Sequence, residues 1–324
     1  MAEKTSLQVP ISSLGIRIKA DATYAGKLKL STAIGQLEEG DQPAARIVLE
    51  SAVSRSEEES RQLFKSLFPA GIEEIGTHGA ALFMRPDSLP NDCALKIEIT
   101  PSVPIVVFAE AMQIELGHIG GDEVVELTAD KVTAEDLVNG PQINVEANEF
   151  RAHTVSTDLK VAALAVAITE VLEGADAEIA ADTVDVTSHS GALSLKLGVV
   201  SDNPTACIKN MQGKGSSLFV DVGEGNAVVE SATSGTITAA GRALGEVAVG
   251  IAEGSGSREL DSPSIAARPA SDEEVLVVRD QGAQVRISVE QRPVVASTRT
   301  PHVVAGELVV PTSPRKEPPA RPRR

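Results

Sequence analysis

Aromatic side chains, cysteines and long apolar runs are scarce in this chain of 324 residues. With no Trp, one Tyr and six Phe, it offers few of the aromatic platforms on which bases, sugars and quaternary amines stack. Its two cysteines, Cys93 and Cys207, exclude a disulfide scaffold and a cysteine-rich metal site. No apolar run approaches the roughly 18 residues of a membrane span, and Met1–Pro10 has no signal-peptide core. We therefore expect a cytoplasmic protein without a transmembrane segment.

Acidic residues outnumber basic ones by 46 to 29, which gives a formal net charge of −17. This excess disfavours nucleic acid as a partner, because the phosphates would repel it. The charge is uneven along the chain: residues 299–324 have six basic and two acidic side chains, so the rest carries −21. Residues 312–324 also contain four prolines and cannot bury a core, so a disordered tail is predicted for residues 311–324.

Near the N-terminus, apolar and polar residues alternate over short stretches. This pattern is typical of strands with one buried and one solvated face. Strands are predicted at Gly15–Lys19, Lys27–Leu30 and Ala45–Val53. A further strand is predicted at Lys96–Ile99.

One amphipathic helix is predicted among these strands, over residues 56–68. Ser56 followed by Glu59 forms a capping box, in which side chains and backbone amides bond reciprocally at a helix start. Pro69 ends the helix. We favour a core-packing helix over the alternative of a partner-binding one. Four apolar side chains fall on one helical stripe: Leu63, Phe64, Leu67 and Phe68.

An internal repeat after residue 104 is the most informative pattern in the sequence. Each unit has an aliphatic residue, an Ala two positions later and an apolar residue three positions beyond. The five units are Val107/Ala109/Met112, Leu127/Ala129/Val132, Val145/Ala147/Phe150, Val161/Ala163/Val166 and Ile179/Ala181/Val184. Their first positions are 20, 18, 16 and 18 residues apart. This period is shorter than a βαβ unit and is typical of one coil of a β-solenoid.

Energetics favour stacking of such coils. One coil buries three or four aliphatic side chains at about 1.5–3 kcal/mol each, whereas ordering its backbone costs about 1–2 kcal/mol per residue. A lone coil of about 18 residues is therefore unstable, and neighbours must cover it. The repeated Ala is predicted to form an internal ladder. Asp130, Asn148 and Asp182, each directly after an Ala, are predicted to lie at corners.

The repeat loosens after Val184. Strands are predicted at Ala192–Leu197, Leu218–Val222 and Gly235–Thr238, a loop at Glu253–Ser257, and a hairpin that joins Val275–Arg279 to Val285–Val289. The predicted fold is all-β, with β-solenoid-like stacked coils of about 16–20 residues per turn and one embedded helix. It comprises a lead at 1–13, the solenoid at 14–250, a β extension at 251–310 and the tail at 311–324.

Several segments together resemble a known family. They are SRSEEESRQLFKSLF at 54–68, CALKIEITPSVPIVVFAEAMQIEL at 93–116, the repeating coils, and Ser-Gly turns such as Ser190-Gly191 and Ser234-Gly235. Over about residues 14–240 the chain resembles the putative-adhesin family of β-strand-repeat proteins, whose function is largely unassigned. Most family coils have Gly-Asp at the corner, where this chain has Ala-Asp or Ala-Asn. The resemblance implies a right-handed β-solenoid-like fold and no catalytic residues, and its adhesin label usually accompanies export.

Candidate ligands for metals and phosphates are few. The five His residues are dispersed, without the spacing of a metal site. His118 and Asp122 lie near a predicted turn, but two ligands are too few, and a solvated loop is favoured. The glycines within Asp221–Asn226 lack the ending of a phosphate-binding loop, so a turn is favoured there. No cofactor or metal is predicted.

A hydrolase site is a further alternative. His189 and Ser190 lie close in sequence to Asp182 and Asp185, which permits a Ser–His–Asp arrangement. No nucleophile-elbow motif accompanies it, and adjacent residues of a strand point to opposite faces. A structural role is therefore favoured for these residues.

Acidic residues of the repeat could form a ladder that binds cations such as Ca²⁺. Glu110, Asp130 and Asp182 are the candidates, but the spacing of calcium-binding coils is absent, so a solvated face is favoured. Cys93 and Cys207 are predicted to be small core residues, with a pairing or reactive role as the alternative.

The tail contains the clearest linear motif. Two PxxPx[K/R] patterns suit polyproline recognition by an aromatic-lined groove, so docking of a protein partner there is one hypothesis. A solubilising or electrostatic tether is favoured over it. The residues concerned are Pro311, Pro314, Lys316, Pro319, Pro322 and Arg324.

The leading functional prediction is a non-enzymatic acidic scaffold or protein-interaction module that presents an extended β surface. One alternative is a self-assembling, bactofilin-like polymer, because uncapped coils expose strand edges. A second alternative is an enzyme with a surface cleft.

Overall fold

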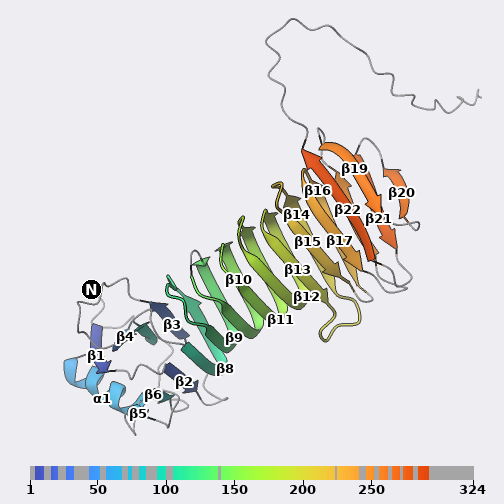
Figure 1. Ribbon diagram of the computed structural model, residues 1–324. Helices are drawn as coiled ribbons and strands as arrows, with labels where there is room; N and C mark the ends of the chain where they lie inside the picture. The colour runs from blue at the N-terminus through green and yellow to red at the C-terminus, as the bar shows by residue number, and fades with distance from the viewer. Residues whose placement is uncertain are drawn as a thin grey trace, which may run out of the picture. The chain divides into compact units, whose positions relative to one another are not determined.

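The structure is a computed structural model of the 324-residue chain. It describes residues 4–10, 16–20, 27–32, 44–51, 56–67, 72–74, 80–84, 93–99, 105–137, 140–222, 225–240, 246–251, 255–261, 265–270, 273–279 and 284–291. These ranges belong to one compact unit of residues 1–292. Within it the fold is a β-solenoid, as the repeat predicts (Figure 1).

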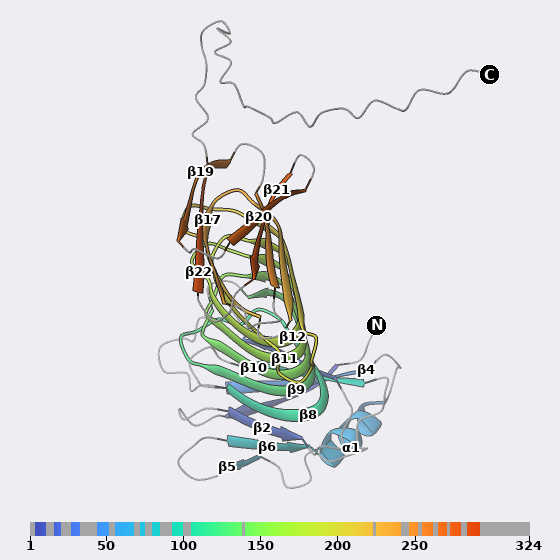
Figure 2. The same cartoon turned by 90° about the vertical axis from the view of Figure 1, so that its right-hand side faces the viewer.

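Five long parallel strands form the centre of the solenoid. They are β8 (Ile105–Leu116), β9 (Val125–Leu137), β10 (Ile143–Val155), β11 (Leu159–Val171) and β12 (Asp176–His189). Each strand bends at a corner, so its two halves lie on opposite sides of the core (Figure 2). In β10 the buried positions change at this corner from Ile143 and Val145 to Phe150 and Ala152. We call the side formed by the first halves face A and the side formed by the second halves face B.

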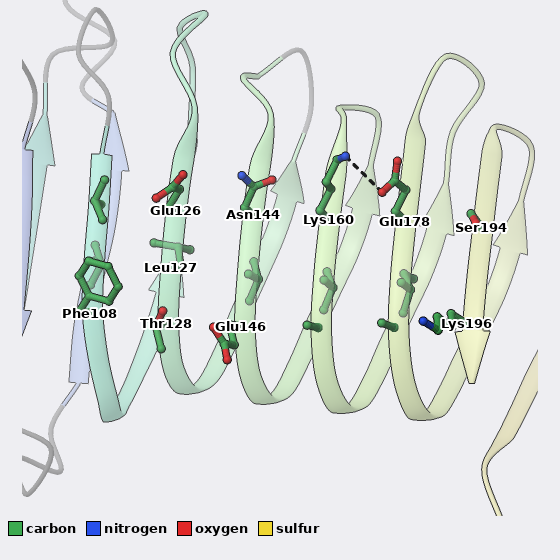
Figure 3. A pocket seen from close by; sticks show the side chains of 17 residues that line it. Phe108, Glu126, Leu127, Thr128, Asn144, Glu146, Lys160, Glu178, Ser194 and Lys196 are labelled. Carbon is green, nitrogen blue, oxygen red and sulfur yellow. Dashed lines mark ion pairs between the residues drawn. The ribbon is translucent and has the colours of Figure 1, made fainter. Parts of the chain in front are cut away.

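The coils wind in a right-handed sense. In Figure 3, the face A strands run downward from Glu126 to Thr128, turn behind the core, return upward, and reach the next coil to the right. This is the handedness expected when a strand crosses over to a parallel neighbour. It is also the handedness that the family resemblance implies.

Beyond β12 each bent strand is replaced by two shorter strands. Face A continues through β13 (Ala192–Leu197), β15 (Ser217–Asp221) and β17 (Gly235–Ala240), and face B through β14 (Thr205–Met211), β16 (Asn226–Ala232) and β18 (Glu246–Ile251). All six pair in parallel with the coils before them, and the register shifts once, between β16 and β18 after Val229. The corner is a single residue in β12, Asp182, whereas residues 198–204 separate β13 from β14. The predicted strands at 192–197, 218–222 and 235–238 are confirmed.

Antiparallel strands end the solenoid on its C-terminal side. They are β19 (Ser255–Asp261), β20 (Ile265–Ala270), β21 (Glu273–Arg279) and β22 (Gln284–Gln291). The predicted hairpin is wrong, because β21 has β18 and β20 as its two neighbours, whereas β22 has β17 and β19. Strands β21 and β22 thus form one further coil, which runs antiparallel to the neighbouring coil of β17 and β18. The loop predicted at 253–257 extends too far, because β19 already begins at Ser255.

The order of the coils differs from the chain order on the N-terminal side. This region contains β1 (Lys4–Pro10), β2 (Ile16–Ala20), β3 (Lys27–Thr32), β4 (Ala44–Ser51), β5 (Ile72–Glu74), β6 (Ala80–Met84) and β7 (Cys93–Ile99). Strands β2 and β3 lie parallel to the two halves of β8 on one side and to β6 and β7 on the other. The coil of β2 and β3 comes first in the sequence, yet it is enclosed between the coil of β6 and β7 on one side and strand β8 on the other. Residues 4–10, within the predicted lead, form β1, which pairs with β4.

Helix α1 (Glu57–Leu67) confirms the predicted capping box. The Ser56 amide donates to Glu59 Oε2 at 2.9 Å, and the Glu59 amide donates to Ser56 Oγ at 3.2 Å. Both bonds satisfy amides that a helix start would otherwise leave unpaired. Leu63 packs against the buried core, which supports a packing role for the helix.

The repeated alanines stack one above another. Ala109, Ala129, Ala147, Ala163 and Ala181 are consecutive register partners on β8 to β12. Four are at most 5% exposed and Ala147 is partly buried, so the predicted internal ladder is confirmed. These positions precede the corner, where the two faces converge and leave space for only a small side chain.

The first repeat unit departs from the others at its third position. Met112 was predicted to align with Val132, but the register shifts after Ala109, and Ile114 is the partner of Val132. Between the register pairs Ala109–Ala129 and Gln113–Lys131, β8 has two more residues than β9. These two residues also explain why the first two repeat units are 20 residues apart. Met112 is still fully buried.

Candidate functional site

A groove of about 560 Å³ lies on the outer surface of face A, across β8 to β13 (Figure 3). Neighbouring strands lie about 4.8 Å apart, so the groove is about 24 Å long and runs across the strands. The first residue of each repeat unit, such as Val145, points inward. The residues directly before and after it point outward and form two rows that line the groove. The first row is Val106, Glu126, Asn144, Lys160, Glu178 and Ser194, and the second is Phe108, Thr128, Glu146, Ala162, Ala180 and Lys196.

The second row gives the groove an apolar floor and an aromatic end. Ala162 and Ala180 are short, so the surface is hollowed between the longer side chains around them. Phe108 marks the β8 end and is 42% exposed. An exposed Phe is noteworthy in a chain that has only six. Lys196 lies at the opposite end, on β13 (Figure 3).

Carboxylates dominate the rim of the groove. Lys160 Nζ lies 3.2 Å from Glu178 Oε2, across β11 and β12. Asp158 and Asp176, each two residues before a first-row position, are exposed on the same side. Within the described part of the chain, Glu126, Glu146, Asp158 and Asp176 form no ion pair. With Glu178, they make five acidic side chains against two lysines.

Face B differs, because its central charges pair with one another. Glu149 accepts from Lys131 at 3.0 Å and also from Arg151. The Lys131 hydrogen bond is the main cause that lowers the pKa of Glu149 below its usual value. Asp185 lies 3.7 Å from Lys209. Face B also has carboxylates without an ion pair among the described residues, such as Glu135, but only those of face A lie beside the groove.

At the corners, polar side chains bond from coil to coil. Asn148 Nδ2 donates to Asp130 Oδ1 at 2.9 Å, as the predicted corner positions allow. Asp182 bonds to the loop after β13. Leu164, 41% exposed, occupies the corner between Asn148 and Asp182. The hypothetical cation ladder is therefore interrupted, and its Asp residues have other partners.

His189 is a buried residue in a column of apolar side chains. It is 0% exposed, and its register partners are Val171 and Met211. Nε2 lies 3.1 Å from the Ser217 carbonyl oxygen, whereas Nδ1 has no partner among the described residues. Burial lowers the pKa of His189 to about 4, so the imidazole is neutral at pH 7.

The groups of the hypothetical hydrolase site do not come together. Ser190 Oγ donates to the Val171 carbonyl oxygen at 3.1 Å rather than to His189. Asp182 lies at the outer corner and Asp185 pairs with Lys209 on face B. Among the described residues, no group of three or more His, Cys, Asp and Glu could hold a metal ion.

Cys207 corrects another prediction. It lies on the outer side of face B, is partly buried, and its Sγ is 3.4 Å from Glu230 Oε1. Burial, followed by Glu230, raises the pKa of its thiol above the usual value, so the reactive thiolate is disfavoured. It is thus a surface residue and not a core residue.

Some predictions lie outside the described residues. They include the tail and its motif residues Pro311, Pro314, Lys316, Pro319, Pro322 and Arg324. No helix in the described ranges has both the length and the apolarity to cross a bilayer. The sequence analysis missed the groove, although the repeat itself contained the signal: the residues on either side of each first repeat position form the two rows.

The fold and the groove together define a β-solenoid with a groove on its outer surface. No protein-family model and no curated protein matches the chain. A structure named as a putative lipid binding protein from Parabacteroides distasonis has 12% identity and a TM-score of 0.33, covering 77% of this chain and 97% of that one. A putative adhesin from the same species has 10% identity and a TM-score of 0.27 at the same coverage. A putative cell adhesion protein from Clostridium sporogenes has 9% identity and a TM-score of 0.24, covering 67% and 98%.

These names include the adhesin label that the sequence resemblance also carries. Similarities of this size assign neither a family nor a function to the chain.

Proposed function

We propose that the protein is a non-enzymatic binding module that holds an extended polypeptide segment in the face A groove. The observation that carries this proposal is the groove itself, which continues over six strands. A length of about 24 Å matches seven or eight residues of an extended chain at about 3.1–3.3 Å each. A groove without convergent reactive groups suits binding better than catalysis.

The rigidity of the scaffold supports this role. Each groove strand pairs in register with its neighbours, and the inward side chains beneath the groove are nearly fully buried. A preformed surface loses little conformational entropy when it binds, so more of the contact energy contributes to affinity.

The arrangement of the strands at both ends favours a binding module over the polymer alternative. The last strands at each end run antiparallel to their neighbours instead of repeating the parallel coil. Pro10 lies at the end of β1 and Pro269 within β20, and proline cannot donate to a further strand. Both features oppose end-to-end growth.

A selection experiment tests the proposal. A phage library of linear peptides is selected on the full-length protein and counter-screened on Ala162→Phe, which fills the hollow of the groove. Ala167→Phe is the matched control, since Ala167 lies on the same strand but on face B. We expect peptides that bind the wild type and Ala167→Phe and lose at least tenfold in affinity for Ala162→Phe. No enrichment, or equal binding to all three proteins, would contradict the proposal.

A further inference from the structure

We infer that the occupant of the face A groove is a cationic segment, with an apolar or guanidinium side chain placed on Phe108. This inference rests on the proposed function and adds the chemistry of the ligand. Three observations support it: the unpaired carboxylates along the rim, the exposed aromatic ring at one end, and the small residues between them.

The carboxylates provide the charge preference. Glu126 and Glu146 line the groove on β9 and β10, and Asp158 and Asp176 are exposed two residues outside its first row, on the turn before β11 and at the start of β12. None forms an ion pair within the described residues, so a cationic ligand need not break an existing contact. Two lysines also line the groove: Glu178 compensates Lys160 at 3.2 Å, and Lys196 lies at the β13 end, opposite Phe108.

Phe108 provides an anchor. At 42% exposure, its ring is accessible to a ligand in the groove. Arginine side chains stack on such rings through cation–π contacts, and proline rings pack on them in grooves that recognise extended peptides. A few buried aromatic contacts generally dominate the affinity of an interface.

The apolar hollow at Ala162 and Ala180 determines the shape of the ligand. No long side chain projects at these two positions, so a peptide backbone can approach the sheet there. A basic, proline-rich segment combines this extended backbone with the required charge, because polyproline II geometry is preformed and has no internal hydrogen bonds.

Fluorescence anisotropy with defined peptides tests the inference. The probe is fluorescein-labelled (Arg-Pro-Ala)₃, which spans about 28 Å as a polyproline II helix. The matched probes are (Gln-Pro-Ala)₃ and (Glu-Pro-Ala)₃. We expect the affinity for the full-length protein to fall at least tenfold from the Arg to the Gln peptide and further for the Glu peptide. The Arg peptide should also bind more weakly as the salt concentration rises from 0.05 to 0.5 M.

Matched variants locate the binding site. Phe108→Ala should lower the affinity for the Arg peptide at least tenfold, whereas Leu164→Ala should leave it within twofold. Leu164 is the control because its 41% exposure is close to the 42% of Phe108 and it lies at the corner, outside the groove. The pair Asp158→Asn and Asp176→Asn should weaken binding, whereas Glu135→Gln on face B should not.

The outcomes separate this inference from the proposed function. If the library yields groove-dependent peptides that are neutral or acidic, the cationic ligand is wrong and the binding module stands. If no peptide depends on Ala162, the binding module itself is wrong. Equal loss of affinity in Phe108→Ala and Leu164→Ala, or binding of a second copy of the chain in the groove, would overturn the assignment of the anchor.

Discussion

The carboxylate of Asp182 accepts a hydrogen bond of 2.9 Å from the backbone amide of Val200 in the next coil. The same oxygen accepts a second bond of 2.7 Å from the Val199 amide. Asp182 is the last single-residue corner along the chain, and residues 198–204 replace it in the next coil. One side chain thus fixes the loop at which the repeat changes its geometry, with Val199 50% and Val200 73% exposed.

Replacement of Asp182 should loosen this loop. In Asp182→Ala, the Val199 and Val200 amides lose a charged acceptor, so their hydrogen exchange at pH 7 should accelerate roughly tenfold. Amide exchange followed by NMR measures this directly. Asp176→Ala, at an exposed position of the same strand, should leave both amides unchanged. Equal acceleration in the two variants would contradict the assigned role.

The same contact should depend on pH in a defined direction. Hydrogen bonds from the Val200 amide and its neighbours lower the pKa of Asp182 below its usual value, because they stabilise the ionised carboxylate. The protection of the loop is therefore fully present above the unfolded-state pKa and is lost as the pH falls through the lowered one. Exchange rates corrected for intrinsic pH dependence, compared between wild type and Asp182→Ala, should converge only in strong acid.

His189 should make the core sensitive to mild acid. Its pKa of about 4 in the fold lies below the usual 6.5, so folding stabilises the neutral form. The stability this provides is present above about pH 6.5 and is lost as the pH falls toward 4. Between pH 7 and pH 5 the loss should be about 2 kcal/mol, at about 1.4 kcal/mol per pH unit.

Denaturant unfolding of wild type and His189→Met at both pH values isolates this effect. Methionine suits the site because Met211 occupies the next position of the column. Carboxylate titration affects both proteins alike, so the wild type should lose about 2 kcal/mol more than the variant. Parallel losses would contradict a buried neutral imidazole, as would protonation of His189 above pH 6 in an NMR titration.

The alanine ladder should reject larger side chains. Ala163 is 4% exposed and lies between Ala147 and Ala181, so Ala163→Leu should overpack the core and cost about 1–3 kcal/mol. Ala162→Leu, one residue earlier on the outer surface, should change the free energy of unfolding by less than about 0.5 kcal/mol. Equal midpoints in thermal melts of the two variants would contradict the inward placement of Ala163.

Substitution of Gly191 by Ala should destabilise the fold, whereas substitution of Gly215 should not. A Cβ at Gly191 would lie 2.3 Å from the Leu172 carbonyl oxygen and 2.9 Å from that of Ala175, and neither backbone atom can withdraw easily. Gly191→Ala should therefore cost about 1–3 kcal/mol. At Gly215 the nearest atom is Glu173 Oε1 at 4.0 Å, so Gly215→Ala should be nearly neutral. Chemical denaturation compares the two, and a neutral Gly191→Ala would contradict the close approach of these turns.

The coil could be predicted from the amino-acid pattern alone. The Ala two residues after an aliphatic position recurs because each of the five bent strands passes the same narrow place beside its corner, so the ladder from Ala109 to Ala181 could be predicted from one chain. The capping box of Ser56 and Glu59 was equally accessible, since all its bonds lie within one helical turn.

The pairing of the strand edges could not be predicted in the same way. The alternation of apolar and polar residues predicts that Val275–Arg279 and Val285–Val289 are strands. The same alternation is expected whether the two strands pair in a hairpin or lie on opposite faces. The hydrogen-bonding groups of the last parallel coil were available on both faces, and the two segments pair there instead of with each other. The repeat indicates which outward residues form the two rows of the groove, but the hollow itself depends on how stacking aligns Phe108, Ala162 and Lys196, which are far apart in sequence.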